Sequence, residues 1–186
     1  TRAAVALAEG HIDYALLRWT PGLASRPDIK GRAVRHWQSM AEALPSRPDI
    51  VVSRSYPMTS ALVGRRLADH FRVPWVMQLS DPWLLYPLHP QGYDRVWNAA
   101  REAECFARAD LVTFTSERTL ARYAKAYPER AARFRYFPNT YDPEEVRPNP
   151  WKKRERLRLV YAGTLGGSRT PDVLCAAIEG LFARRP

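Results

Sequence analysis

Val73-Pro-Trp-Val-Met-Gln-Leu-Ser-Asp-Pro-Trp83 is the stretch that decides how this chain folds. Residues 73–79 form a short apolar run typical of a buried strand, and the Ser-Asp-Pro that follows ends it, because proline cannot donate to a sheet ladder. The pattern predicts that Asp81 lies just beyond the carboxyl end of a core strand. Ligands bind at that end of an open α/β sheet, so Asp81 is a candidate functional residue. A turn or helix cap before Pro82 explains the same aspartate equally well.

Elements of the same kind flank this stretch on both sides. We expect strands at residues 48–53, 109–115 and 134–137, and helices at residues 32–44, 58–71, 92–108 and 116–127. Alternation of strands and helices predicts an α/β fold with a Rossmann-like parallel sheet and helices on both faces. In the helix at 92–108 we expect a buried face of Val96, Ala100, Ala103 and Ala107.

The alternation of expected strands and helices is interrupted after residue 140. Residues 141–156 carry three prolines among charged side chains, which is typical of an inter-domain linker. We expect a first domain at 1–140 and the start of a second at 157–186, with a strand at 157–162, a glycine-rich turn, and a helix capped by Thr170 with Pro171 in its first position. Such a turn can hold a phosphate at the helix N-terminus, with Arg169 as a fixed cation, although a tight turn without a ligand fits equally well.

Composition limits the possible partners. The formal net charge is +10 and the sequence pI is near 10.1, but the basic residues are scattered, which disfavours a nucleic-acid binder and favours a solvated surface. Attraction to a phosphorylated substrate or to an anionic membrane surface fits better. No apolar run approaches the roughly 20 residues needed to span a bilayer.

Cysteine and histidine give no sign of a metal site. Cys105 and Cys175 are far apart on expected helices and are typical of free buried thiols, which favours a reducing cytoplasm. The four histidines lack a second ligand at metal-binding spacing, and no Asp-x-Asp is present. We therefore expect neither a metal nor a resident cofactor.

Five blocks taken together resemble the family-4 glycosyltransferases of the GT-B fold, over about three quarters of the chain. The blocks are Pro48-Asp-Ile-Val-Val52; Val73-Pro-Trp-Val76 with Ser80-Asp-Pro-Trp83; Ala109-Asp-Leu-Val-Thr113 with Ser116-Glu117; Phe137-Pro-Asn139; and Val160-Tyr-Ala-Gly-Thr-Leu-Gly166. The resemblance implies two Rossmann-like domains facing each other across a cleft. The first would receive an acceptor, and the second would bind a nucleotide-diphosphate sugar as co-substrate, without a required metal.

The resemblance also assigns roles to residues of this chain. Asp81 would be the general base that takes a proton from the acceptor hydroxyl. The donor-binding residues would be Gly163, Thr164, Gly166, Gly167, Arg169 and Asn139, and Thr140 departs from the glycine that many relatives carry after this asparagine. The loop after residue 82 would bind the acceptor through Trp83, Tyr86 and His89, unless it simply packs on its own domain or touches a membrane.

The resemblance further implies segments that this chain lacks. A first strand with its glycine-rich loop would precede Thr1, and a paired-glutamate motif would follow Pro186. We therefore expect a truncated GT-B pair that is inactive in isolation. In the full protein the expected function is transfer of a sugar, hexosyl or related, from a nucleotide-diphosphate donor to a carbohydrate or lipid-linked acceptor. That activity would serve polysaccharide or glycolipid biosynthesis at the inner face of a membrane. The alternative is a non-catalytic α/β binding domain.

Overall fold

The computed structural model describes residues 26–28, 30–87, 89, 93–146, 158–163 and 170–184. The chain divides into two compact units, Thr1–Tyr141 and Asp142–Pro186. Each unit is described by itself below. The functional assignment of the two domains and of the linker between them stays a prediction.

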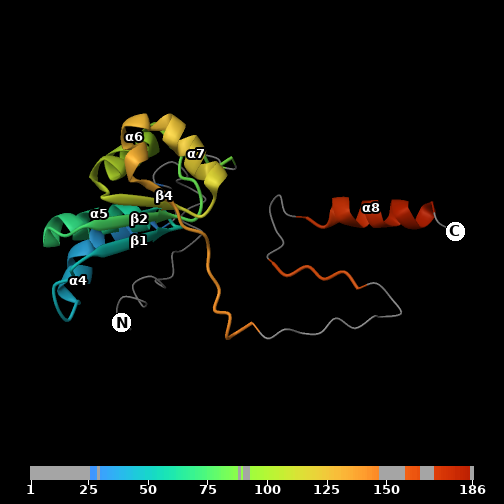
Figure 1. The fold of residues 1–186 in the computed structure, drawn as a ribbon, viewed down its shortest axis with the longest axis horizontal. Helices are drawn as coiled ribbons and strands as arrows, with labels where there is room; N and C mark the ends of the chain where they lie inside the picture. The colour runs from blue at the N-terminus through green and yellow to red at the C-terminus, as the bar shows by residue number, and fades with distance from the viewer. Residues whose placement is uncertain are drawn as a thin grey trace. The chain divides into compact units, whose positions relative to one another are not determined.

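A four-stranded parallel sheet organises the first unit (Figure 1). Its strands are β1 (Val51–Ser55), β2 (Trp75–Leu79), β3 (Leu111–Phe114) and β4 (Phe134–Tyr136), in the order β1-β2-β3-β4. The register sets Val51 beside Trp75 and Met77 beside Val112. The parallel α/β sheet that the sequence predicts is confirmed.

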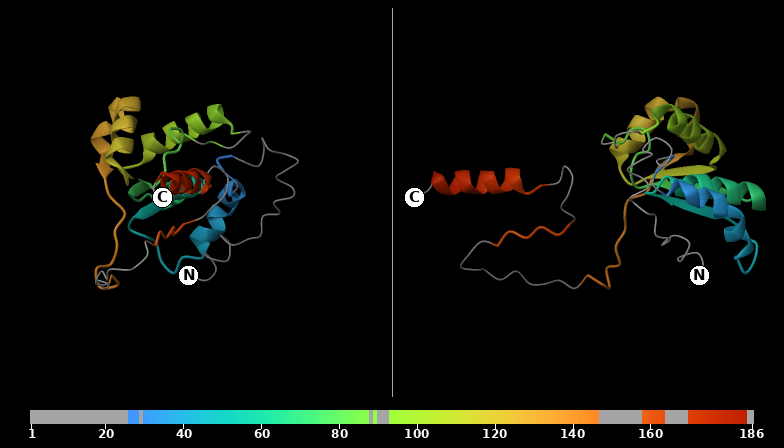
Figure 2. Two further views of the ribbon diagram at one scale, coloured as in Figure 1. Left: turned by 90° about the vertical axis from the view of Figure 1, so that its right-hand side faces the viewer. Right: turned by 180° about the vertical axis from the view of Figure 1, so that it is seen from behind.

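The connecting helices lie on one face of this sheet. The helical segments are η1 (Gly31–His36), α4 (Trp37–Glu42), α5 (Thr59–Phe71), α6 (Arg95–Arg108), α7 (Glu117–Ala126) and η2 (Pro128–Arg133). Each strand is added on the same side of the previous one, so right-handed crossovers bring α5, α6 and α7 to a common face. Figure 2 shows α6 and α7 on the same side of the strands. Helices for the opposite face, which the sequence also predicts, are not among the described residues.

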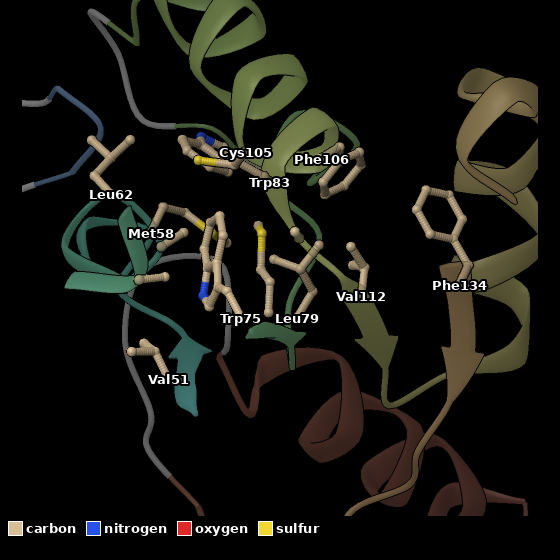
Figure 3. Close-up of a cluster of buried hydrophobic side chains, with 14 of the residues drawn as sticks. Val51, Met58, Leu62, Trp75, Leu79, Trp83, Cys105, Phe106, Val112 and Phe134 are labelled. Atoms are coloured by element: carbon tan, nitrogen blue, oxygen red, sulfur yellow. The ribbon is translucent and has the colours of Figure 1, made fainter. Parts of the chain in front are cut away.

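The hydrophobic core fills the space between the sheet and these helices (Figure 3). In β1 and β2 every second residue is buried, as expected for strands covered on one face. Trp75 from β2 and Phe106 from α6 are at most 1% exposed. The core therefore depends on one layer of strand side chains meeting one layer of helix side chains.

The expected first residues of two strands, β1 and β2, are wrong. β2 begins at Trp75 rather than at Val73, because Arg72 adopts a left-handed conformation (φ 53°) that ends α5. The Val73 N–H still donates to the Ala68 carbonyl, 3.1 Å away, so this residue belongs to the helix end. β1 likewise begins at Val51, whose N–H donates to the Pro74 carbonyl over 2.9 Å.

Gly64 permits the close approach of α5 to β1 and β2. A Cβ at this position would lie 2.7 Å from Ser53 Cβ and 2.9 Å from Trp75 Nε1. We expect Gly64→Ala to lower the free energy of unfolding by about 1–3 kcal/mol, because a rigid indole must shift. Urea denaturation checks this, with Arg66→Ala on the exposed side of α5 as the control. Equal stability of Gly64→Ala and the control would show that the interface has room for a methyl group.

The second unit contains α8 (Asp172–Ala183). Its N-cap is Pro171 and no side chain caps it, so the expected Thr170 cap is wrong. Residues 158–162 form no strand, contrary to expectation, and Leu159, Val160 and Tyr161 are more than half exposed. A strand needs a neighbour to satisfy its backbone groups, and the described part of this unit offers none. The Cys175 thiol is exposed rather than buried, whereas Cys105 is buried as expected.

Candidate functional site

Polar side chains from β1 and from the residues that follow β2, β3 and β4 meet at the carboxyl edge of the sheet. Arg54, in β1, donates from Nε to Ser80 Oγ over 3.1 Å and from Nη2 to Asn139 Oδ1 over 2.9 Å. Thr115, directly after β3, donates from its hydroxyl to the Ser80 carbonyl over 3.0 Å. Parallel strands end at the same edge, which is how residues 85 positions apart are joined. The residue before Asp81 is therefore held from both neighbouring strands.

Asp81 lies exposed at this edge, one residue beyond Ser80. Among the described residues its carboxylate has no hydrogen-bond partner, and it caps no helix, so the cap interpretation receives no support. The nearby Tyr56 hydroxyl has a raised pKa, first through burial and then through the charges of Asp28, Tyr86 and Asp81. Asp81 is thus an exposed carboxylate close to Tyr56, and the preceding residue is fixed by Arg54 and Thr115.

Asp28 brings a second carboxylate close to the same edge. It is 6% exposed and accepts hydrogen bonds from the backbone N–H and the hydroxyl of Thr59, at 2.8 and 2.7 Å. These contacts satisfy the first turn of α5, where unpaired N–H groups favour a negative charge. Asp28 is therefore occupied with the start of α5, whereas Asp81 has no such contact among the described residues.

The loop after β2 is anchored to the helices. Trp83 is 1% exposed and its indole N–H donates to Asn98 Oδ1 over 2.8 Å, so the expectation that it contacts an acceptor is corrected. Tyr86 is half-buried and meets the His89 ring edge-on at 5.7 Å between centroids. His89 is itself stacked on Tyr93 at 3.7 Å. Of the three expected acceptor-binding residues, Tyr86 and His89 remain candidates.

A family model of the glycosyl transferase 4-like domain matches residues 4–140. The chain belongs to this family of glycosyltransferases. Comparisons with curated proteins and with solved structures gave no match. The matched region contains the whole carboxyl-edge cluster and ends one residue after Asn139. The family membership supports glycosyl transfer in general as the activity of this domain.

The donor-side residues of the glycosyltransferase are only partly described. Thr164, Gly166, Gly167 and Arg169 lie outside the described residues. A Cβ added to Gly163 would lie 2.8 Å from the Tyr161 hydroxyl, so the glycine allows a close contact within the second unit. Asn139 belongs to the first unit, where it accepts from Arg54. Donor binding by these residues stays a prediction.

Sequence reasoning missed Arg54 and Glu102. Arg54 is one of several scattered arginines, and only the sheet register brings it to Asn139. Glu102 is 1% exposed on α6, where the buried face is Asn98, Glu102, Cys105 and Phe106; the expected face is wrong, and Val96 is 84% exposed. Asn98 and Glu102 are polar, so the buried face does not show as a helical repeat of apolar residues in the sequence. Their four-residue spacing nevertheless indicates that they share one face of the helix.

The described residues contain neither a metal-binding group nor a helix able to cross a membrane. Within the described ranges, no three His, Cys, Asp or Glu side chains form a group that could hold a metal ion. In the same part of the chain, none of the helices has the length and apolar character required to cross a bilayer. Burial raises the pKa of the Cys105 thiol to about 12, so this cysteine stays protonated at neutral pH.

Glu102 should make the stability of the glycosyltransferase depend on pH. Burial raises the pKa of its carboxyl group, against the opposing effect of the Leu84 N–H and the Tyr127 and Tyr123 hydroxyls. The folded state then binds more protons than the unfolded state between the two pKa values. The pKa of a glutamate in the unfolded chain is about 4.3. The free energy of unfolding therefore falls as pH rises from this pKa through the pKa of Glu102 in the folded state. The total loss is about 1.4 kcal/mol for each pH unit between the two pKa values.

Glu102→Gln removes this titration and tests the sign. We expect wild type to lose stability relative to the variant as pH rises, with a constant difference above the folded pKa. Urea denaturation of both proteins from pH 5 to pH 8 checks this. Parallel stability curves would contradict a raised pKa at this position.

Proposed function

We propose that this glycosyltransferase moves a sugar from a nucleotide-diphosphate donor to a hydroxyl of a carbohydrate or lipid-linked acceptor, with Asp81 as the general base. The observation that carries the proposal is the Asp81 carboxylate at the carboxyl edge of the sheet, which is exposed and has no hydrogen-bond partner among the described residues. That edge is where open α/β sheets bind ligands. The carboxylate is exposed, and the residue before it is fixed by Arg54 and Thr115.

The proposed step is a proton transfer coupled to group transfer. Asp81 accepts the proton of the acceptor hydroxyl. The oxygen of that hydroxyl forms the glycosidic bond to the anomeric carbon of the donor sugar. The bond from that carbon to the diphosphate breaks, and the nucleoside diphosphate leaves with the bonding electrons. Asn139 is proposed to contact the donor, together with Gly163, Thr164, Gly166, Gly167 and Arg169, whose backbone and charge would stabilise the leaving diphosphate.

Tyr86 and His89 are proposed to receive the acceptor. Both are half-buried, and their rings meet at 5.7 Å, so each combines an apolar face with a polar group. They follow Asp81 on the same loop, which is anchored at Trp83. This places the proposed binding side chains and the proposed base on one continuous segment.

Contact with an anionic membrane is proposed from charge. Arg118, Arg122 and Lys125 are exposed, and their spacing puts them on one face of α7. Trp83 is buried and Leu85 packs against the core, so these two side chains of the loop do not support insertion into lipid. Sedimentation with anionic vesicles at low salt, but not with neutral ones, would support the contact. Equal recovery with both vesicle types would remove it.

Release of nucleoside diphosphate tests the proposed activity directly. The protein, with whatever chain its gene encodes on either side of this segment, is incubated with UDP-, GDP- and ADP-sugars, and with or without a mixture of sugar and glycolipid acceptors. We expect release that depends on the acceptor and on one donor. Donor or acceptor binding without any release would instead favour a non-catalytic binding domain.

A further inference from the structure

A buried carboxylate and a buried amide on α6 face the loop that follows β2. Glu102 is 1% exposed, and Asn98, one helical turn earlier, is fully buried. Side chains four residues apart share a face of a helix, so the two form one polar strip. The proposed sugar transfer uses neither side chain, and their role must therefore lie in what they hold.

The strip holds the loop at two consecutive residues. The Leu84 N–H donates to Glu102 Oε2 over 2.8 Å. The Trp83 N–H donates over 2.8 Å to the Tyr123 hydroxyl, which in turn donates to Glu102 Oε2 over 2.9 Å. The Trp83 indole N–H reaches Asn98 Oδ1 over 2.8 Å. The loop backbone is thus fixed by side chains from two different helices.

Packing alone does not account for a carboxylate at this place. A methionine would fill a similar volume, but it would leave the Leu84 N–H without its acceptor. The Tyr127 hydroxyl, which donates to Glu102 Oε1 over 2.8 Å, would lose its acceptor too. Desolvation also works against the charged form of Glu102. The carboxylate instead fixes the positions of the groups that donate to it, which are the Leu84 N–H and the Tyr123 and Tyr127 hydroxyls.

We propose that Glu102 is a positioning residue for sugar transfer: it fixes the loop after β2 so that Asp81 and Tyr86 stay at the carboxyl edge of the sheet. Asp81 lies two residues before Trp83, and Tyr86 lies two residues after Leu84. A shift of the anchored pair therefore moves both. The inference rests on the proposed function, since the position of Asp81 matters only if it acts on an acceptor.

Two substitutions at one position separate positioning from packing. Glu102→Met keeps the volume and removes both acceptors, and we expect it to lower kcat by about tenfold to a hundredfold and to raise the acceptor KM. Glu102→Gln keeps one oxygen for the Leu84 N–H, and its NH₂ can donate to the Tyr127 hydroxyl. We expect this variant to restore kcat to within about threefold of wild type. Glu104→Gln, at a half-buried carboxylate of α6 that pairs with Arg65 and Arg101 rather than with the loop, is the matched control and should keep wild-type kcat and acceptor KM.

A folded Glu102→Met protein with wild-type kcat and acceptor KM would overturn the proposal. Amide hydrogen exchange of the wild-type protein decides the matter if that variant does not fold. We expect the Leu84 and Trp83 amides to be protected like the Met77 amide in β2, and exchange as fast as in an exposed turn would overturn the anchoring. If wild type transfers no sugar from any donor, the proposed function fails, whereas the exchange result still decides whether the loop is held.

Discussion

Replacement of Asp81 by asparagine is expected to lower kcat by about a hundredfold or more without changing stability. The substitution keeps the shape of the side chain and removes the lone pair that would take the acceptor proton. Asp81 is exposed and has no hydrogen-bond partner among the described residues, so the fold loses nothing. The measurement is kcat with a saturating donor and acceptor, beside a urea denaturation curve.

Asp49→Asn is the matched control for this prediction. Asp49 is also exposed, but it precedes β1 and so lies at the amino end of the strands. It should retain wild-type kcat. Equal kcat values for the two variants would show that Asp81 is not the base, even in a protein that transfers sugar.

Replacement of Phe106 by alanine is expected to lower the free energy of unfolding by about 3–5 kcal/mol. Phe106 is 1% exposed on α6, and its ring meets the rings of Tyr123, Tyr127 and Phe134 edge-on at 5.3, 4.8 and 5.5 Å. The variant loses the buried area of the ring, leaves a cavity, and removes three aromatic contacts at the place where α6, α7 and β4 meet.

Val96→Ala is the control for this core prediction, because Val96 lies on the same helix and is 84% exposed. Its stability should stay within about 0.5 kcal/mol of wild type. Urea denaturation followed by circular dichroism provides both values. A Phe106→Ala protein that is as stable as Val96→Ala would mean that the aromatic cluster does not support the core.

The sequence predicted the alternation of strands and helices because that signal is local. Each strand is a short apolar run between turn residues, and some helices carry residues that mark their start. Ser116, for example, caps α7 as expected, with the Thr119 N–H 3.4 Å from its hydroxyl. The position of Asp81 at a strand end follows from the same local reasoning.

Contacts between distant residues were beyond sequence reasoning. Arg54 and Asn139 meet only because β1 to β4 are parallel and in a particular register. Trp83 follows a proline in a loop, so the sequence indicates an exposed aromatic residue. In the structure it is buried, with its backbone N–H hydrogen-bonded to the Tyr123 hydroxyl and its indole N–H hydrogen-bonded to Asn98. A buried tryptophan requires a partner for its N–H, and that partner is 15 residues away in the chain.

The second unit shows a further limit of local signals. Residues 158–162 have the apolar composition of a strand but form none in the described structure. A parallel strand is stable only beside neighbours, and apolar composition cannot say whether they are present. In contrast, α8 satisfies most of its own backbone groups, so it forms although the described part of its unit contains no strand.

A crystal structure of the protein with its acceptor bound is the most direct test of Asp81 as the general base. We expect the reactive acceptor hydroxyl to lie about 2.6–3.2 Å from an Asp81 carboxylate oxygen, with the sugar against Tyr86 and His89 at the carboxyl edge of the sheet. An acceptor bound elsewhere, with Asp81 still exposed to solvent, would contradict both the site and the role of Asp81.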